Sequence, residues 1–395
     1  MNDVTVLIAG GGIGGLTAAL ACARRGFTVR LFEQAATFAD IGAGIQLSPN
    51  ATRVLHALGL EPALRRVAFV PGGTEMRHWR RGHVLSANPL GDAVVRAFGF
   101  PYYHVHRADL IAALEHEARA TANVALFNNA RIGDVTRNEP GVTLTAGGEP
   151  HRGDVLVGAD GIHSTVRASL FGPEAPTFTG NVAWRALVPV ERLPAGLVRP
   201  MSTVWWGPHK HFVHYYVRGG ALVNCVCVVE KSGWETESWT ERGDHAELAA
   251  DFAGWHDTVQ TLIDRMDRNQ CFKWALFDRP PMARWGDGRV TLLGDACHPT
   301  LPFMAQGAAM AIEDAAVLAA CLAAERAPAL ALARYEDRRR SRTRRIQEGS
   351  RRNAKVFHMT GIPAWFRNRA ARRASGRMLD WVYGYDSFQE AAEVS

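Results

Sequence analysis

A cluster of glycines near the start of the chain constrains the fold more than any other feature. An apolar run over residues 4–9 leads directly into Gly10-Gly11-Gly12-Ile13-Gly14-Gly15, after which alanine and leucine recur at helical spacing over residues 16–25. This order predicts a strand, a tight turn and a helix. A second apolar run over residues 28–32 ends in Glu33. Together these segments predict a βαβ unit with parallel strands and a right-handed crossover.

The spacing of the glycines matches the GxGxxG fingerprint of dinucleotide-binding folds at Gly10, Gly12 and Gly15. Residues without side chains let the backbone turn sharply and approach a pyrophosphate at the positive end of the following helix. Glu33 stands at the end of the next predicted strand, where an acidic side chain accepts hydrogen bonds from ribose hydroxyls. The fingerprint predicts a bound dinucleotide and leaves NAD and FAD as alternatives.

Two further predicted strands end in an aspartate beside small residues. Residues 155–159 lead into Asp160-Gly161, and residues 290–293 lead into Gly294-Asp295. The carboxyl ends of parallel strands share one edge of a sheet, and in this architecture a nucleotide lies at that edge. We therefore expect Asp160 and Asp295 to belong to the nucleotide site.

The composition and the hydrophobic pattern of the sequence change between residues 182 and 275. This stretch is rich in Trp, Tyr, Val and His, and it contains alternating segments that end in turns such as Arg218-Gly219-Gly220. It predicts an antiparallel sheet inserted into the nucleotide-binding domain, before helical patterns return over residues 308–324 and 330–358. The predicted fold class is α/β. A Rossmann-like domain would cover residues 1–180 and 279–345, a substrate domain 181–278 with a contribution from 70–100, and a helical segment 346–395.

Composition argues against several other classes of protein. The chain has 45 Lys and Arg against 39 Asp and Glu, and the net charge of +6 favours anionic small molecules but falls short of a nucleic-acid binder. The arginine-rich stretch over residues 338–352 is interpreted as a solvated or interdomain helix face. Six cysteines without a CxxC pair predict reduced, packed thiols and no metal site. Because residues 315–324 are too few to span a bilayer and no targeting segment is recognised, we expect a cytoplasmic protein without membrane or nucleic-acid partners.

Taken together, these motifs resemble the FAD-dependent aromatic hydroxylases, the single-component flavoprotein monooxygenases that include salicylate hydroxylase. The resemblance covers nearly all 395 residues. It is carried by the glycine fingerprint, Glu33, Gly42-Ala43-Gly44-Ile45-Gln46, Pro49-Asn50, Arg107, Asp160-Gly161, Gly294-Asp295, Gln306-Gly307-Ala308 and the arginine-rich helix. It implies that the Rossmann-like domain binds FAD.

The resemblance also implies roles for single residues in binding FAD. Glu33 would hold the adenosine ribose, Arg107 would lie near the pyrophosphate, and Asp295 would contact the ribityl chain. Asp160 would lie where flavin binding is linked to the docking of NAD(P)H, and Gln46 would also belong to the cofactor site.

A helix that starts with small residues at Gln306, Gly307 and Ala308 fits the same site. Its free N–H groups would face the N1–C2=O edge of the flavin, where reduced flavin carries negative charge. Because the chain has a single dinucleotide fingerprint, NADH or NADPH would bind only transiently elsewhere. These residues do not distinguish NADH from NADPH.

The implied reaction is hydroxylation of an aromatic acid with NAD(P)H and O₂ through a flavin C4a-hydroperoxide. It needs a group that accepts the phenolic proton, because phenolate is the better nucleophile. Strand alternation over residues 209–216 puts His211 and Tyr215 on one face, and His214 and Tyr216 on the other. Related 3-hydroxybenzoate 6-hydroxylases carry a functional His at the place of His214, and 6-hydroxynicotinate hydroxylases use His and Tyr at the places of His211 and Tyr215. We prefer His214, with Tyr216 in the substrate pocket, and keep His211 and Tyr215 as the alternative.

Pro302 and Phe303 precede the flavin-contacting helix, where family members place pocket residues. The 3-hydroxybenzoate enzymes have Gln where Pro302 stands, and the hydroxynicotinate enzymes have His where Phe303 stands. Without these polar groups the segment is similar to salicylate hydroxylase-like proteins, so we expect a salicylate-like acid that is decarboxylated to a catechol. The alternatives are a 3-hydroxybenzoate 6-hydroxylase, a 6-hydroxynicotinate 3-monooxygenase, or a flavin oxidase or dehydrogenase that does not hydroxylate.

The expected partners are therefore a small aromatic acid and O₂, and the oligomeric state stays open. Contacts to the ring and carboxylate of the acid are expected from Trp184, Arg185, Trp205 and Trp206. Each tryptophan also has the alternative of serving as a core residue.

Overall fold

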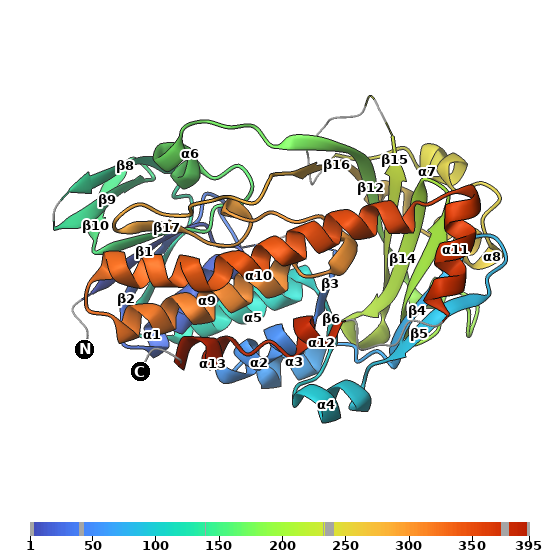
Figure 1. Cartoon of the computed structure of the whole chain (residues 1–395), viewed down its shortest axis with the longest axis horizontal. Coiled ribbons are helices and arrows are strands. Elements are labelled where there is room, and N and C mark those ends of the chain that lie inside the picture. Colours follow the sequence, from blue (N-terminus) through green and yellow to red (C-terminus); the bar gives the residue numbers. More distant parts are fainter. Residues whose placement is uncertain are drawn as a thin grey trace.

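The computed structural model describes residues 4–38, 43–138, 140–231, 233, 241–372 and 379–392. Gly42, which helps to carry the resemblance, lies outside the described residues, as do small parts of the three predicted domain ranges. The chain forms two halves, each built on a sheet, and the long helix α10 (Pro328–Phe357) runs past both of them (Figure 1).

The glycine-rich start forms the predicted βαβ unit. β1 (Thr5–Ala9) pairs in parallel with β2 (Thr28–Phe32), and α1 (Ile13–Arg24) connects them. A parallel sheet with the order β17-β11-β1-β2-β7 is built around this unit, which confirms the Rossmann-like fold. Its other strands are β7 (Val124–Phe127), β11 (Val155–Gly158) and β17 (Val290–Leu292). Since β11 and β17 run parallel to β1, their carboxyl ends lie at the edge where α1 begins.

Helices rich in small residues cover this sheet. α9 (Gly307–Ala324) and α5 (Arg107–Ala120) both pack against α1. A Cβ on Gly14 would lie 2.7 Å from the Leu293 side chain and 3.2 Å from that of Ala311, so only glycine allows α1 and α9 to approach this closely. The shorter helices of the first half of the chain are α2 (Pro49–Ala57), α3 (Glu61–Val67), α4 (Asp92–Phe98) and α6 (Thr165–Phe171).

The middle of the chain forms the predicted inserted sheet, with the order β16-β12-β15-β14-β13-β4-β5. Neighbouring strands are antiparallel except β13 and β4, which are parallel. Two strands from within residues 70–100 join this sheet at its edge. The bounds are β4 (Gly73–His78), β5 (Val84–Pro89), β12 (Thr177–Pro189), β13 (Met201–Gly207), β14 (Lys210–Val217), β15 (Leu222–Glu230) and β16 (Phe272–Asp278).

Two helices lie inside the stretch that was expected to form only strands. α7 (His245–Asp251) is capped by the Asp244 carboxylate, which accepts from Ala246 N, and α8 (Asp257–Asp264) follows it. Both helices cover one face of the inserted sheet, and their apolar side chains pack with those of the strands in a second core that includes Trp184, Trp205, Phe212, Leu248, Phe252 and Leu262. One face of the sheet is therefore filled with core side chains.

Two smaller sheets were not predicted from the sequence. β8 (Ile132–Asn138), β9 (Gly141–Ala146) and β10 (Glu149–Gly153) form an antiparallel sheet beside the Rossmann-like sheet. β3 (Gly44–Leu47) pairs with β6 (Tyr103–His106). Gly44 N donates to Asn224 Oδ1 at 2.7 Å, so the second of these sheets is tied to β15 of the inserted sheet.

Helix α10 contains the arginine-rich stretch and is continuous through the expected domain boundary at residues 345 and 346. At 1.5 Å per residue it is about 45 Å long. Arg339 and Arg342 are buried against Glu313 and Asp314 of α9, whereas Arg344 is exposed. The interpretation of the stretch as a solvated or interdomain face is therefore corrected for its buried members, which form an ion network. α11 (Gly361–Ala371), α12 (Asp380–Tyr383) and α13 (Ser387–Ala392) follow.

Helix α9 is longer than the apolar stretch recognised over residues 315–324. By length and composition it could cross a membrane, but 72% of it is buried inside the structure, and a core helix passes the same test. The six cysteines are buried free thiols, as expected. Among the residues that the structure describes, no three His, Cys, Asp or Glu side chains gather as a metal site would require.

The substitution Arg339→Met tests the importance of the ion network between α9 and α10. Arg339 Nη2 lies 2.7 Å from Glu313 Oε2, Nε lies 2.7 Å from Asp314 Oδ1, and all three side chains are fully buried. Breaking a buried ion pair by removing one partner costs about 3–5 kcal/mol, so the free energy of unfolding in urea should fall by that amount. Arg344→Met is the control. Because Arg344 is exposed on the same helix, its substitution should change the free energy of unfolding by less than about 0.5 kcal/mol. Equal effects of the two substitutions would contradict the assignment.

Candidate active site

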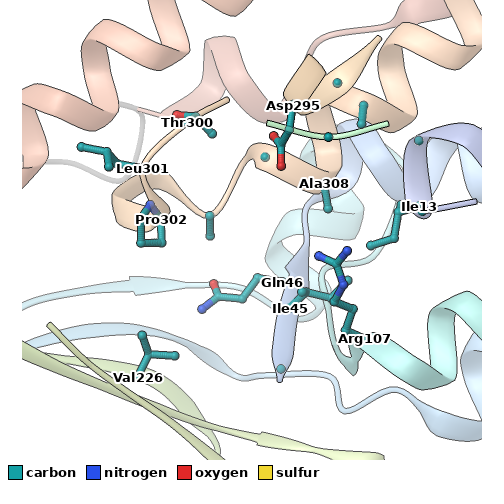
Figure 2. A pocket seen from close by; sticks show the side chains of 18 of the residues that line it. Ile13, Ile45, Gln46, Arg107, Val226, Asp295, Thr300, Leu301, Pro302 and Ala308 are labelled. Atoms are coloured by element: carbon teal, nitrogen blue, oxygen red, sulfur yellow. The ribbon is translucent and has the colours of Figure 1, made fainter. Parts of the chain in front are cut away.

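A cavity of about 340 Å³ lies between the parallel sheet and the inserted sheet. In Figure 2 the Asp295 carboxylate points into it from above and the Arg107 guanidinium from below. Val226 of β15 bounds it from the inserted sheet, and Thr300, Leu301 and Pro302 form a further wall. Both halves of the chain line the cavity, so neither half forms the site by itself.

The three glycines of the fingerprint have two different tasks. Gly10 has φ +101°, and a Cβ there would collide with the backbone of Ala159. A Cβ on Gly15 would collide with Gly10 O, so both residues are needed for the tight strand–turn–helix packing. Gly12 lines the cavity, and a Cβ there would meet no atom within 4 Å. A pyrophosphate can therefore approach the N–H groups at the start of α1 past Gly12.

Two charged side chains face the cavity, the half-buried Arg107 at the start of α5 and the more exposed Asp295 after β17. Burial lowers the pKa of Arg107, and the charge of Asp295 opposes this shift. Burial raises the pKa of Asp295, and His298 and Arg107 oppose it. A guanidinium suits a pyrophosphate, and a carboxylate suits the hydroxyls of a ribityl chain. The residues present therefore fit FAD.

Helix α9 begins at the cavity with small residues, because Gly307 and Ala308 belong to its lining. The first N–H groups of a helix have no partner within the helix and can donate to a carbonyl of a ligand. The side chain of Gln306, expected at the cofactor site, instead turns into a buried polar cluster: its Nε2 donates to Ser48 Oγ at 3.0 Å and its Oε1 accepts from Asn50 Nδ2 at 3.1 Å. Gln306 thus fixes the start of α9 against α2.

Glu33 and Asp160 lie close to the cavity without belonging to its lining. The Glu33 carboxylate accepts from Gly11 N at 2.7 Å and from Ala35 N at 2.8 Å, which holds it beside the glycine turn. Each oxygen keeps a further lone pair for a ribose hydroxyl. The Asp160 carboxylate accepts from Ser164 Oγ and from Val166 N, so in this structure it caps α6. Its link to NAD(P)H docking stays a prediction.

Strand β14 presents His211, Val213 and Tyr215 to the cavity. His214 and Tyr216 lie on the opposite face, towards the core that α7 and α8 cover. The expectation that His214 and Tyr216 line the substrate pocket is therefore corrected. The alternative pair, His211 and Tyr215, occupies the cavity, because the covering helices decide which face of the strand stays open.

The surroundings of His214 are those of a core residue. Its ring centroid lies 6.2 Å from that of Trp205, and neither of its ring nitrogens has a hydrogen-bond partner among the described residues. Burial lowers its pKa to about 3, with Glu75 opposing the shift and Arg77 adding to it. On the same face, the Tyr216 hydroxyl donates to Val198 O at 2.9 Å.

A half-buried cation lies on the inserted-sheet side of the cavity. Arg185 lines the cavity, and its guanidinium carbon lies 4.5 Å from the centroid of the Trp274 ring. Burial lowers the pKa of Arg185 to about 9, with Arg107 adding to the shift and Tyr215 opposing it. Arg185 therefore remains protonated at neutral pH and suits a carboxylate or another anionic group of a ligand.

The remaining predicted pocket residues lie at different depths. Pro302 lines the cavity, whereas Phe303 is buried behind it with its ring centroid 5.1 Å from that of His211. Gln46 also lines the cavity, where its Oε1 accepts from the Tyr102 hydroxyl at 2.6 Å and its Nε2 donates to Ser202 Oγ at 3.1 Å. Gln46 can thus face both the cofactor and a substrate.

Several cavity residues were missed by sequence reasoning. Trp274, Val213 and Val226 line the cavity, while Trp184, Trp205 and Trp206 are buried elsewhere in the cores. Trp274 stands opposite Ala183 in the pairing of β16 with β12, and this register is the signal that would have selected it. Register between strands so distant in the sequence cannot be read from alternation alone.

The comparisons with known proteins agree with this geometry. The chain matches the FAD binding domain family over residues 3–350. It is 39% identical to the 3-amino-4-hydroxybenzoate 2-monooxygenase PtmB3 of Streptomyces platensis, over 98% of this chain and 97% of that protein. It is 38% identical to the 6-hydroxynicotinate 3-monooxygenase of Bordetella bronchiseptica, over 98% of this chain and 96% of that protein.

A solved substrate complex of a salicylate hydroxylase shares the fold. It is similar with a TM-score of 0.82 at 27% identity, over 100% of this chain and 98% of the other. The family match, the relatives and a cavity whose residues fit FAD lead to one conclusion. The chain belongs to the FAD binding domain family and is an FAD-dependent aromatic monooxygenase.

Proposed function

We propose that this enzyme acts on an aromatic acid whose ring hydroxyl stands ortho or para to the carboxylate, and hydroxylates the ring carbon that carries the carboxylate. Salicylate is the first candidate, with catechol and CO₂ as products. The observation that carries the proposal is that His211, Tyr215 and Arg185 line one cavity together with the apolar side chains of Val226 and Pro302.

Arg185 is the anchor for the acid. It is a half-buried arginine whose guanidinium lies beside the Trp274 ring, and the charge of Arg107 adds to the positive potential around it. An anionic substrate relieves the repulsion between the two arginines, so binding of an acid is favoured over binding of a neutral phenol. The Trp274 ring adds an aromatic surface next to the anchor.

His211 is the base. Burial lowers its pKa well below the usual value, and His358 adds to the shift, so the imidazole is neutral at physiological pH and can accept a proton. Loss of the hydroxyl proton pushes electron density into the ring and towards the carbon that is ortho or para to the oxygen. When oxygen bonds to that carbon, the bond to the carboxylate breaks, CO₂ leaves, and the electron pair of that bond restores the aromatic ring.

The chemistry that FAD supplies when bound is acceptance of a hydride from NAD(P)H and activation of O₂. Residues of this chain exclude water from the place where these steps meet the substrate. Val213, Val226, Leu301 and Pro302 give the cavity apolar walls. Apolar walls limit the wasteful loss of activated oxygen to water.

A specific observation favours a second candidate, 6-hydroxynicotinate. The cavity holds His211 and Tyr215, the positions at which the resemblance places the functional His and Tyr of hydroxynicotinate enzymes. In 6-hydroxynicotinate the hydroxyl stands para to the carboxylate-bearing carbon, so the same proton transfer activates it. Phe303 stands where those enzymes have His, and for this reason salicylate remains the first candidate.

The substitution Glu33→Ala tests the FAD site. It removes a carboxylate beside the glycine turn, and a hydrogen bond to a charged group contributes about 1.5–3 kcal/mol. The Kd for FAD, measured by fluorescence titration of the apoprotein, should rise at least about tenfold. Glu149→Ala on the exposed strand β10 is the control. An unchanged Kd in the Glu33 variant would reject its role.

The substitution His211→Asn tests the base and the choice of strand face. Hydroxylation should slow by about 10²-fold or more while FAD content stays intact, because general base catalysis is lost. His214→Asn is the matched control on the same strand and should hydroxylate close to the wild-type rate. If His214→Asn slowed hydroxylation and His211→Asn did not, the face of β14 that carries His214 would be the catalytic one.

Product analysis tests the position of hydroxylation. Salicylate, 6-hydroxynicotinate, 3-hydroxybenzoate and 3-amino-4-hydroxybenzoate would each be supplied with NADH or NADPH, and products, CO₂ and hydrogen peroxide would be measured. We expect catechol and CO₂ from salicylate, because Pro302 offers no side-chain hydrogen bond to steer a ring towards para-hydroxylation of 3-hydroxybenzoate. Gentisate from 3-hydroxybenzoate, with only hydrogen peroxide from salicylate, would overturn the proposal.

A further inference from the structure

We propose that His211, His358 and Glu230 form a proton path that carries the hydroxyl proton of the bound acid from the cavity to solvent. The inference deepens the proposed function and rests on it, because it needs a substrate with an ionisable hydroxyl. It assigns a task to the end of α10 and to a surface carboxylate, neither of which lines the cavity.

The three side chains form a continuous chain of hydrogen bonds. His211 Nδ1 lies 2.8 Å from His358 Nε2, and His358 Nδ1 lies 2.9 Å from Glu230 Oε1. Glu230 Oε2 lies 2.7 Å from Nδ1 of His209 at the surface. Along this series of hydrogen bonds the exposed fraction of the side chain rises from 2% at His358 to 43% at Glu230 and 64% at His209. The path thus begins in the cavity and ends in water.

The donor and acceptor roles are consistent in one direction. For His211 Nε2 to accept a proton from a ligand, the neutral ring must carry its own proton on Nδ1. That N–H then donates to His358 Nε2, so His358 carries its proton on Nδ1 and donates it to the Glu230 carboxylate. Each ring nitrogen of His211 and His358 then has the donor or acceptor role that an outward proton transfer requires.

The surroundings of the path favour transfer over storage of the proton. The rings of Phe303 and Phe357 pack against His211 with centroid distances of 5.1 and 5.3 Å, so the imidazole has apolar neighbours. The ionisable groups that act on His358 are Glu230, which raises its pKa, and His209 and Arg367, which lower it, against a dominant lowering by burial. Both imidazoles are therefore neutral at rest.

Glu230 suits the role of exit group. Burial raises its pKa, but hydrogen bonds from His209 and His358 outweigh this effect and hold the pKa below its usual range. It is therefore ionised at neutral pH and able to receive a proton, which it then loses readily to water. A single carboxylate at the protein surface gives the path a defined end.

The backbone holds these residues in place. His209 has φ +58°, a left-handed conformation that is unfavourable for a residue with a side chain. Its N–H donates to His358 O at 3.1 Å, and its carbonyl accepts from Glu230 N at 2.9 Å. The turn before β14, the end of β15 and the end of α10 are thus fixed to one another at the outer end of the path.

The transfer balances without any further reactant. The ligand O–H bond breaks and its proton bonds to His211 Nε2, the Nδ1 proton of His211 passes to His358 Nε2, and the Nδ1 proton of His358 passes to Glu230. Glu230 then releases a proton to water. A proton that returns along the same atoms after the reaction protonates the product oxygen and restores both histidines to their initial tautomers.

The test measures proton release in FAD-loaded, oxidised enzyme without NAD(P)H. The probe is 5-nitrosalicylate, whose nitro group acidifies the hydroxyl, mixed in weak buffer with a pH-indicator dye in a stopped-flow instrument. Quenching of flavin fluorescence reports binding, and the dye reports the proton. In wild-type enzyme release should follow binding directly, whereas in Glu230→Gln binding should be unchanged and release at least about tenfold slower.

Glu348→Gln is the matched control, because this glutamate is similarly exposed at 48% and pairs with Arg344 away from the path. It should release the proton as wild-type enzyme does. His358→Gln should show the same delay as Glu230→Gln, which guards against a purely local effect at the surface. Wild-type release rates in both variants would overturn the path. If the probe fails to quench the flavin of wild-type enzyme and no other hydroxylated aromatic acid does so, the proposed function is overturned and the path falls with it.

Discussion

The buried ion network between α9 and α10 is the interaction on which the rest of the structure depends. Glu313 and Asp314 are fully buried, and burial raises the pKa of each carboxylate. Arg342 and Arg339 outweigh this effect at Glu313, and His298 and Arg339 outweigh it at Asp314, so both pKa values lie below their usual range. Breaking such pairs is strongly unfavourable, so the two helices are held in one register. That register sets the start of α9 at the cavity and carries the end of α10 to the inserted sheet.

The cavity is a product of this arrangement, because its two sides come from different halves of the chain. The half with the parallel sheet supplies Arg107 from the start of α5 and Asp295 from the turn after β17, and the inserted sheet supplies His211, Tyr215 and Arg185. The bond from Gly44 N to Asn224 Oδ1 fixes β3 against β15. A Cβ on Gly44 would lie 2.7 Å from the Tyr215 ring, so the absence of a side chain there lets a cavity residue keep its place.

The parts of the fold that could be predicted are those with local signals. The βαβ unit, the strands before Asp160 and Asp295 and the long helices follow from apolar periodicity and glycine spacing, which act within a few turns of chain. The face of β14 could not be predicted this way. Alternation separates His211 from His214, but the choice between them depends on α7 and α8, which cover one face and come from a stretch rich in strand-forming aromatics.

The sequence also failed to predict the surroundings of polar residues that can face either a ligand or solvent, or the protein interior. Gln306 stands at the start of α9, the helix expected to contact the flavin, yet Ser48 and Asn50 provide partners that turn its side chain inwards. The same holds for the arginines of α10, since a sequence shows their charge but not the carboxylates of α9 that bury two of them. Long-range pairing of polar groups decides these cases, and it becomes visible only once the helices are placed.

The electrostatics of the cavity connect the fold with the chemistry. Arg107 and Arg185 are both half-buried and line the same cavity, and burial together with the charge of Arg107 lowers the pKa of Arg185 to about 9. Two cations that line one partly buried cavity repel each other until an anion binds. A pyrophosphate on one side and an aromatic carboxylate on the other would each relieve this repulsion, so the binding of cofactor and acid should be mutually favourable. In the proposed function His211 would then face the acid, and because its imidazole is neutral at rest it could accept a proton without first adding a third positive charge to the cavity.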